Sequence, residues 1–143
     1  HTSAGTAALE QAQAFVKLGV DPSKVAIGHT QRNNDIWYLS QVTTRGCYLE
    51  FDGTSRIKYL PDSSRVNLVK GLTELGYGKQ ILLGTDSGKR SYQKAYGSVT
   101  GMDFDPAVFG PRLLDEGMDR EVVMDLLVNN AQTFFQFGPG RQQ

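Results

Sequence analysis

The sequence predicts an α/β fold in which strand–helix units repeat along the chain and their strands form a parallel sheet. Two observations in the 143 residues carry this prediction. Short apolar runs alternate with longer amphipathic segments, and a glycine closes three of the four amphipathic segments. Glycine just past the last periodic residue is a common helix end. Strands that alternate with helices in this way are typical of parallel sheets.

Three apolar runs have the length of buried strands. We expect strands at residues 25–28, 47–51 and 80–84. Each run is entered through a turn that contains proline or glycine, such as Asp21-Pro22-Ser23 before the first. Cys47 lies inside the second run with no histidine or aspartate at the spacing of a nucleophile's partner, so we assign it to the core.

The amphipathic segments carry apolar residues at three- and four-residue spacings, which predicts helices. These segments cover residues 7–18, 36–43, 66–75 and 122–128. The first three end at Gly19, Gly46 and Gly76.

Candidate ligand side chains follow the strands, where the chain turns toward the next helix. His29, Asp52 and Asp86 follow the three predicted strands, and His1 is expected to end a fourth strand that begins before this chain. The carboxyl ends of parallel strands are where a (β/α)8 barrel builds its active site. The pattern therefore favours part of such a barrel, although four units could also form a small open sheet.

The length of the chain indicates which part of a barrel it forms. A complete (β/α)8 barrel takes about 250 residues, and this chain has 143 and begins with His rather than Met. We expect residues 1–137 to form roughly βα units 5 to 8 of a TIM barrel within a longer chain. We assign residues 138–143 to a C-terminal tail.

Composition narrows the classes of partner. Fifteen basic and fifteen acidic residues give no net charge, which offers no electrostatic footprint for nucleic acid or an anionic membrane. No apolar run approaches the roughly 20 residues of a membrane span, and one cysteine cannot form an internal disulfide. We expect a cytoplasmic protein that binds a small molecule. The sequence leaves open whether two copies form a homodimer.

The two histidines and Asp86 suggest a metal site. Imidazole and carboxylate are common ligands of zinc and other transition metals. A single histidine at a strand end is more often an ordinary polar residue, and an aspartate before Ser-Gly is often a turn or helix cap. Three such residues at equivalent positions, His1, His29 and Asp86, point toward a metal site, and the spacing alone leaves the ordinary polar interpretation open beside it. For Asp52, before Gly53, we favour the turn interpretation.

Basic and aromatic residues are interleaved after the last two strands. The basic residues are Arg56, Lys58, Lys89 and Arg90. The tyrosines between and beside them are Tyr59, Tyr92 and Tyr96. Because the net charge is balanced, this concentration of cations predicts an anionic group on the substrate, such as a phosphate or carboxylate. Solvated surface charge is the alternative.

Several short motifs occur along the chain in a characteristic order. They are His1-Thr2-Ser3, Leu9-Glu10-Gln11, residues 19–25, Ile27-Gly28-His29, Phe51-Asp52, Tyr59-Leu60-Pro61-Asp62, Thr85-Asp86 and Phe134-Phe135. In this set the chain resembles the phosphotriesterase-related branch of the amidohydrolase superfamily over nearly its whole length.

The resemblance implies a metal-dependent hydrolase. Its members are (β/α)8 barrels with two divalent metal ions, usually zinc, and a metal-bridged hydroxide that attacks a lactone or ester carbonyl or a phosphoester. The resemblance implies that His1 and His29 bind the more exposed ion, and that Asp86 binds the buried ion and accepts the hydroxide proton. The other ligands, a His-x-His pair on strand one and a carboxylated lysine on strand four, would come from the N-terminal half of the same barrel.

Two positions depart from the family pattern. Phosphotriesterases proper carry a proton relay at the positions of Gly53 and Arg32, where this chain has neither histidine nor aspartate. The departure favours a lactone or ester with an anionic group, including a phosphorylated sugar lactone, over a neutral phosphotriester. Lys58, Lys89 and Tyr92 stand where the resemblance implies binding of such a phosphate. The rival hypothesis is a non-catalytic α/β module that binds a phosphorylated ligand through its basic loops.

Overall fold

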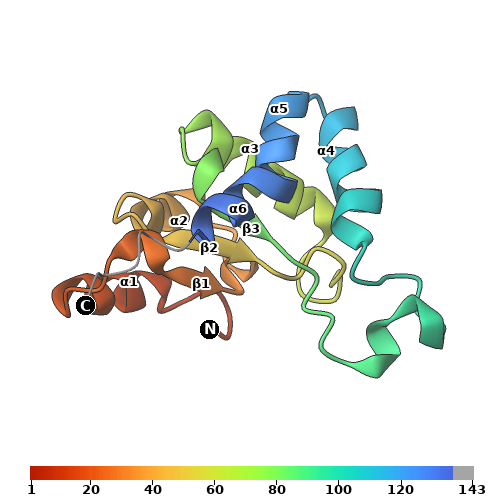
Figure 1. Cartoon of the computed structure of the whole chain (residues 1–143), viewed down its shortest axis with the longest axis horizontal. Coiled ribbons are helices and arrows are strands. Elements are labelled where there is room, and N and C mark those ends of the chain that lie inside the picture. The colour runs from red at the N-terminus through yellow and green to blue at the C-terminus, as the bar shows by residue number, and fades with distance from the viewer. Residues whose placement is uncertain (137–143) are drawn as a thin grey trace.

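The computed structural model describes residues 1–136 and contains a three-stranded parallel sheet (Figure 1). The strands are β1 (Ala26–Gly28), β2 (Tyr48–Phe51) and β3 (Ile81–Leu83), paired in the order β1-β2-β3. In the register, Ile27 lies opposite Leu49, and Leu49 lies opposite Ile81. Strands that neighbour one another in chain order are the arrangement expected for consecutive βα units. The predicted tail, residues 138–143, lies outside the described residues.

Helices follow each strand and also precede the first. They are α1 (Ala8–Lys17), α2 (Ile36–Thr43), α3 (Asp62–Glu74), α4 (Gly110–Asp115), α5 (Arg120–Met124) and α6 (Asn130–Phe134). Consecutive helices pack on one another, α1 on α2 and α2 on α3. The predicted helix stops are confirmed, since Gly19, Gly46 and Gly76 have φ angles of 75°, 88° and 87°. This left-handed conformation favours glycine, which has no Cβ.

The N-terminal residues run beside β1 without forming a strand. The backbone N–H and the hydroxyl of Thr2 both donate to the carbonyl oxygen of Gly28, at 3.1 and 2.9 Å. The expected fourth strand is therefore represented only by this contact in the described residues. It nevertheless places His1 next to the carboxyl end of β1.

The C-terminal part contains more helix than the sequence pattern predicts. A single helix was expected at residues 122–128, whereas two helical segments pack together, one from Asp105 to Asp115 and one from Arg120 to Phe134. The sequence pattern missed the first segment because it contains Pro106 and Pro111, and proline usually interrupts helices. Pro106 lies in the first turn, where proline is tolerated, and Pro111 lies at the start of α4, after the π-helical turn. Each segment includes a wider π-helical turn.

The core lies between the sheet and its helices. On the strands, Ile27, Leu49 and Ile81 are almost fully buried, and Cys47 is buried as expected. The helices contribute to the same cluster, principally with Ala8, Ala12, Leu39, Val42, Val66, Val69, Leu72, Leu113 and Leu126.

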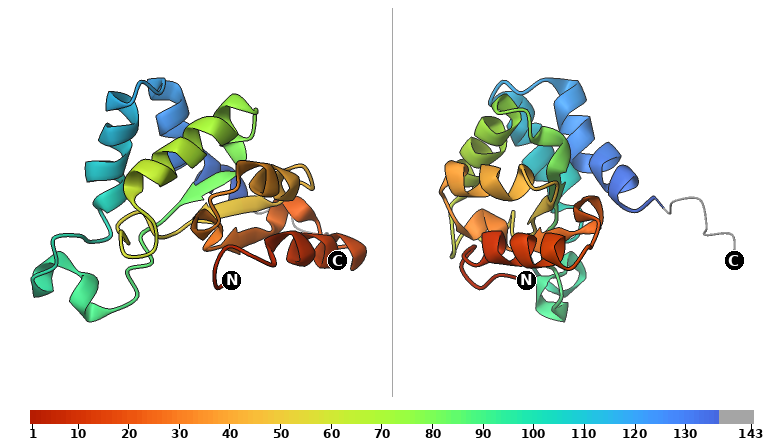
Figure 2. Two further views of the ribbon diagram at one scale, coloured as in Figure 1. Left: turned by 180° about the vertical axis from the view of Figure 1, so that it is seen from behind. Right: turned by 90° about the vertical axis from the view of Figure 1, so that its left-hand side faces the viewer.

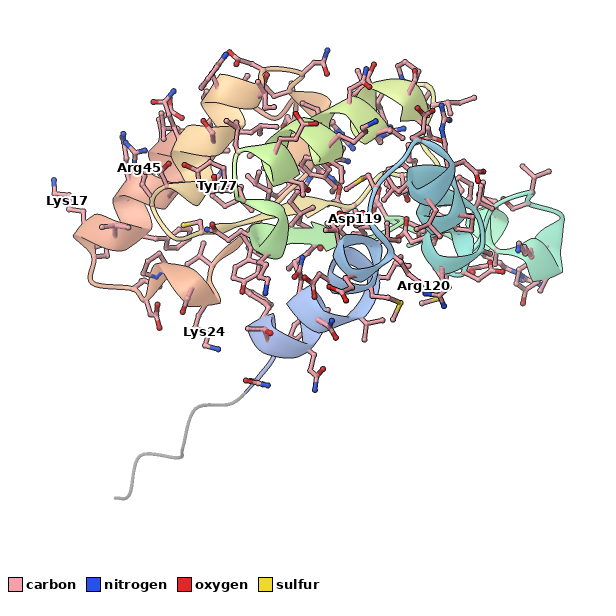
Figure 3. All side chains as sticks on the ribbon, turned by 90° about the horizontal axis from the view of Figure 1, so that it is seen from above. Lys17, Lys24, Arg45, Tyr77, Asp119 and Arg120 are labelled. Atoms are coloured by element: carbon pink, nitrogen blue, oxygen red, sulfur yellow. The ribbon has the colours of Figure 1, made fainter. Side chains whose placement is uncertain are left out.

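The last helix is attached to the end of the sheet where the strands begin. The side-chain amide of Asn130 donates to the carbonyl oxygens of Gly78 and Ile81, both at 2.8 Å. The ammonium of Lys24, before β1, donates to the Phe134 carbonyl at 3.4 Å (Figure 3 labels Lys24 beside this helix). These contacts connect the end of the described chain to its beginning.

At the opposite end of the sheet, the chain after β3 makes a long excursion. Residues 84–104 extend away from the sheet and the helices before the chain returns at Asp105 (Figures 1 and 2). Within residues 1–136, no helix combines the length and the apolar character needed to cross a bilayer.

Candidate functional site

His29 is fixed at the end of β1 by Asp52, which follows β2. His29 has a left-handed backbone with φ of 62°, and its N–H donates to Asp52 Oδ2 at 3.1 Å. Its ring Nδ1 lies 2.6 Å from Asp52 Oδ1. Because a carboxylate only accepts hydrogen bonds, Nδ1 carries the proton. Nε2 is then the ring nitrogen that can bind a ligand.

The two predicted histidine ligands lie together. The ring centroids of His1 and His29 are 4.3 Å apart, and the rings meet edge to face at 81°. Thr2 fixes this pair from the backbone side through its two bonds to Gly28. The structure thus brings together two imidazoles from residues 28 positions apart in the sequence.

Asp86 contacts Arg56 and not the two histidines. Its backbone has φ of 48°, and its carboxylate Oδ2 lies 3.0 Å from Nη2 of Arg56, which also donates to the Asp86 carbonyl oxygen. Among residues 1–136, no three or more His, Cys, Asp or Glu side chains are grouped so that they could hold a metal ion. The structure therefore pairs His1 with His29 and does not add Asp86, whose role as a ligand stays a prediction.

The turn interpretation of Asp52 is wrong. Its side chain is only 13% exposed and accepts three N–H groups, two from His29 and one from the Gln31 amide at 2.9 Å. The sequence signal was its position directly after a strand, equivalent to that of His29. The contribution of Gln31 had no such signal, because only the folded chain brings it to Asp52.

Glu50 is a second carboxylate that sequence reasoning missed. It lies two residues before Asp52, which directly follows β2, so both side chains project toward the same face of the sheet. A Cβ on Gly28 would lie 3.1 Å from Glu50 Oε2 and 3.2 Å from Asp52 Oδ2. Burial raises the pKa of Glu50, and the negative charge of Asp52 raises it further. The face of the sheet beside His29 is therefore acidic.

The cations after β2 and β3 stack on tyrosine rings. Arg56 and Lys89 both approach the Tyr92 ring, at 4.2 and 5.8 Å from its centroid. Lys58 lies 4.7 Å from the Tyr59 centroid and lowers the pKa of that phenol. Such contacts attract cations to the faces of aromatic rings and hold the long side chains in place.

The three predicted substrate-binding residues share one cavity of about 360 Å³. Its lining residues are Arg56, Lys58, Tyr59, Asp86, Gly88, Lys89 and Tyr92. Arg90 is not among them, because its guanidinium stacks on Tyr96 at 4.0 Å instead. The cavity thus joins Asp86 to a group of cations contributed by two different loops.

The first turns of α3 hold the backbone of Arg56 through Arg65. Arg65 is 1% exposed, and its guanidinium bonds to Asp62 Oδ1 at 2.5 Å and to the Arg56 carbonyl oxygen at 2.8 Å. This buried contact fixes the loop that carries Arg56 and Lys58. The position of the cations therefore depends on α3 as well as on the loop.

A model of the Phosphotriesterase family matches residues 1–135. The chain belongs to the phosphotriesterase family. The resemblance read from the motifs is confirmed, and with it the fold class: the chain supplies roughly βα units 5 to 8 of a (β/α)8 barrel.

Relatives within the phosphotriesterase family match almost all of this chain. A phospho-furanose lactonase of Mycoplasmopsis synoviae is 37% identical over 149 residues, which cover 99% of the chain and 42% of the relative. A phosphotriesterase homology protein of Escherichia coli is 32% identical, covering 95% of the chain and 46% of the relative. The chain therefore spans less than half the length of these family members.

Solved structures of other proteins have a similar architecture. An amidohydrolase from Mycoplasma synoviae superposes with a TM-score of 0.91 at 36% identity, covering 99% of this chain and 42% of that one. A lactonase from Listeria monocytogenes gives a TM-score of 0.91 at 35% identity, covering 97% of this chain and 44% of that one.

The two relay positions of the phosphotriesterases proper are used differently here. A Cβ on Gly53 would lie 2.6 Å from the Gln31 side-chain nitrogen. Arg32 donates to the Ser3 carbonyl oxygen at 2.9 Å and stacks on Tyr59 at 4.2 Å. Arg32 therefore has partners in Ser3 and Tyr59, whereas the space beside Gly53 is occupied by the side chain of Gln31.

Proposed function

We propose that this chain is the C-terminal half of a metal-dependent hydrolase that opens a lactone or ester carrying an anionic group. One observation carries the proposal: the oriented His29 lies on the same end of the sheet as a cavity lined by Lys58, Lys89 and Tyr92. The names of the relatives, which include a phospho-furanose lactonase and an aryldialkylphosphatase, support a hydrolase and do not favour the non-catalytic module.

His1, His29 and Asp86 are of residue types that bind divalent ions, and we propose that the intact site holds two such ions, as zinc. Imidazole nitrogen and carboxylate oxygen are ordinary zinc ligands, and the bond from Nδ1 of His29 to Asp52 leaves Nε2 to bind. His1 and His29 would hold one ion and Asp86 the other. When bound, such ions acidify water and polarise the oxygen of the ester.

The side chains of this half would carry out proton transfer and substrate binding. Asp86 would accept a proton at a carboxylate oxygen. The cations of the cavity would hold the anionic group of the substrate and orient the carbonyl. The N-terminal half of the same barrel would supply the other metal ligands and close the site.

Elemental analysis of the intact protein, with its N-terminal half, tests this proposal. We expect about two divalent ions per chain. His29→Ala and Asp86→Asn should each lose bound metal together with lactonase activity. Asp115→Asn, at the exposed end of α4, is the matched control and should keep both. Protein without transition metal after growth in zinc or manganese would contradict the proposal.

A further inference from the structure

Gln31 is buried next to the candidate site. It is 1% exposed and lies in the short turn Thr30–Arg32 that follows His29. Its side-chain nitrogen donates to Asp52 Oδ1 at 2.9 Å, and the same oxygen accepts the His29 ring nitrogen at 2.6 Å. The amide and the imidazole therefore share one acceptor, and the amide limits the rotation of the carboxylate that orients the ring.

Position 53 is matched to this amide. A Cβ added to Gly53 would lie 2.6 Å from Nε2 of Gln31, closer than real Cβ contacts, which lie near van der Waals distance. The Gln31 amide would have to move, and it is held by burial and by its bond to Asp52. A side chain at position 53 and the present position of Gln31 therefore exclude each other.

We propose that Gln31 and Gly53 form a positioning pair that fixes the Asp52 carboxylate and, through it, the ring of His29. The pair rests on the proposed function only in that the oriented Nε2 is taken as a metal ligand. It also gives a physical reason for the departure at position 53, because an imidazole there requires a different residue at position 31. Replacing Gly53 by histidine alone would then disturb His29 instead of adding a relay.

The competing explanation is that Gln31 only fills space. Gln31→Met separates the two, because methionine keeps most of the volume and loses the N–H donor. Gly53→Ala tests the same bond independently, since the added methyl group displaces the Gln31 amide from Asp52 without changing residue 31. If the pair acts as proposed, both variants release Asp52, and the double variant is no worse than either single one.

The measurement is the exchange rate of the His29 Nδ1–H proton, followed by NMR with ¹⁵N-labelled histidine on the metal-free intact protein. We expect this proton to exchange about tenfold faster in Gln31→Met and in Gly53→Ala, because its acceptor is no longer held. The double variant should match the single ones. Gln13→Ala, on the exposed face of α1, is the control and should leave the rate unchanged.

A second readout is the affinity for zinc, which should fall roughly tenfold in the same two variants. An unchanged exchange rate in Gln31→Met, or additive effects in the double variant, would overturn the positioning pair. The NMR result needs no bound metal. Failure of the metal proposal and failure of the pair are therefore distinguishable.

Discussion

At the scale of single residues, Asp105 is a buried carboxyl group whose pKa is strongly raised. It is 7% exposed, and its Oδ1 accepts a 2.5 Å bond from the buried hydroxyl of Thr54. Burial raises the pKa of Asp105 to about 6, and the negative charge of Asp62 adds to this effect while the Thr54 bond opposes it. This contact joins the loop after β2 to the first residue of the C-terminal helical segment.

The raised pKa predicts how stability varies with pH. The folded state holds the Asp105 proton more tightly than the unfolded state, so its contribution is complete below about pH 4 and is lost as pH rises through about 6. The loss amounts to about 3 kcal/mol at most, since each pKa unit corresponds to about 1.4 kcal/mol. Asp105→Asn should remove this pH dependence.

The pH dependence due to Asp105 can be measured by denaturant unfolding of the wild-type protein and the Asp105→Asn variant between pH 4 and 7. The free energy of unfolding of the wild-type protein minus that of the Asp105→Asn variant should fall as pH rises across this range. A difference that stays constant would show that Asp105 ionises in the folded protein as easily as in the unfolded chain.

Sequence position was enough to predict which side chains lie near one another at the end of the sheet, but not the bonds between them. His1 and His29 were expected to lie together because His29 follows a strand and His1 was expected to end one, and parallel strands end at one edge of the sheet. The role of Asp52 depends on its bonds to His29, and that of Gln31 depends on its bond to Asp52. Such contacts join residues about 20 positions apart, and the local sequence pattern does not predict them.

At the scale of elements, two loops form the cationic cavity. Lys58 belongs to the loop after β2, whereas Lys89 and Tyr92 belong to the long segment after β3. A charged contact between an ammonium and a phosphate contributes about 1.5–3 kcal/mol. Each lysine should therefore matter for a charged substrate and not for a neutral one.

Lys58→Met and Lys89→Met test the two loops in the intact protein. Each should raise KM for a phosphorylated or carboxylated lactone by about tenfold to a hundredfold, while the KM of the neutral analogue stays the same. Lys17→Met, at the exposed end of α1, is the matched control (Lys17 is labelled in Figure 3). Neutral lactones or triesters that react faster than charged ones, with both lysine variants unaffected, would show that the cations are ordinary surface charge.

The elements themselves were largely predictable. Glycine stops and apolar spacing located the first three helices and the three strands, because both signals are local. The segment from Asp105 to Asp115 was missed since its Asp-Pro and Gly-Pro pairs are typical of loops. It is helical because packing against the Arg120–Phe134 segment outweighs the local preference.

At the scale of the whole molecule, the sheet in the described residues has one unpaired edge at β3 and another at β1, where only Thr2 bonds to the Gly28 carbonyl. Within residues 1–136, β1 and β3 each pair with β2 alone. Unpaired strand edges present free N–H and C=O groups to other chains. Close to β1, helix α1 and its end also expose Phe15, Val16 and Leu18.

We therefore expect residues 1–143 produced alone to associate. Light scattering during size-exclusion chromatography should show a mass above 15.7 kDa that grows with concentration. Co-expression with the N-terminal half of the barrel should give one defined species with cooperative unfolding. A compact monomer with cooperative unfolding from residues 1–143 alone would show that these edges need no partner.

The contacts of Asn130 and Lys24 have an evolutionary consequence. They secure the C-terminal helix at the end of the sheet where the strands begin, away from the loops that carry the cations. Neither contact involves a residue of those loops. Substitutions in the loops can therefore accumulate without removing the contacts that hold the C-terminal helix, so that one end of the molecule can diverge while the other preserves stability.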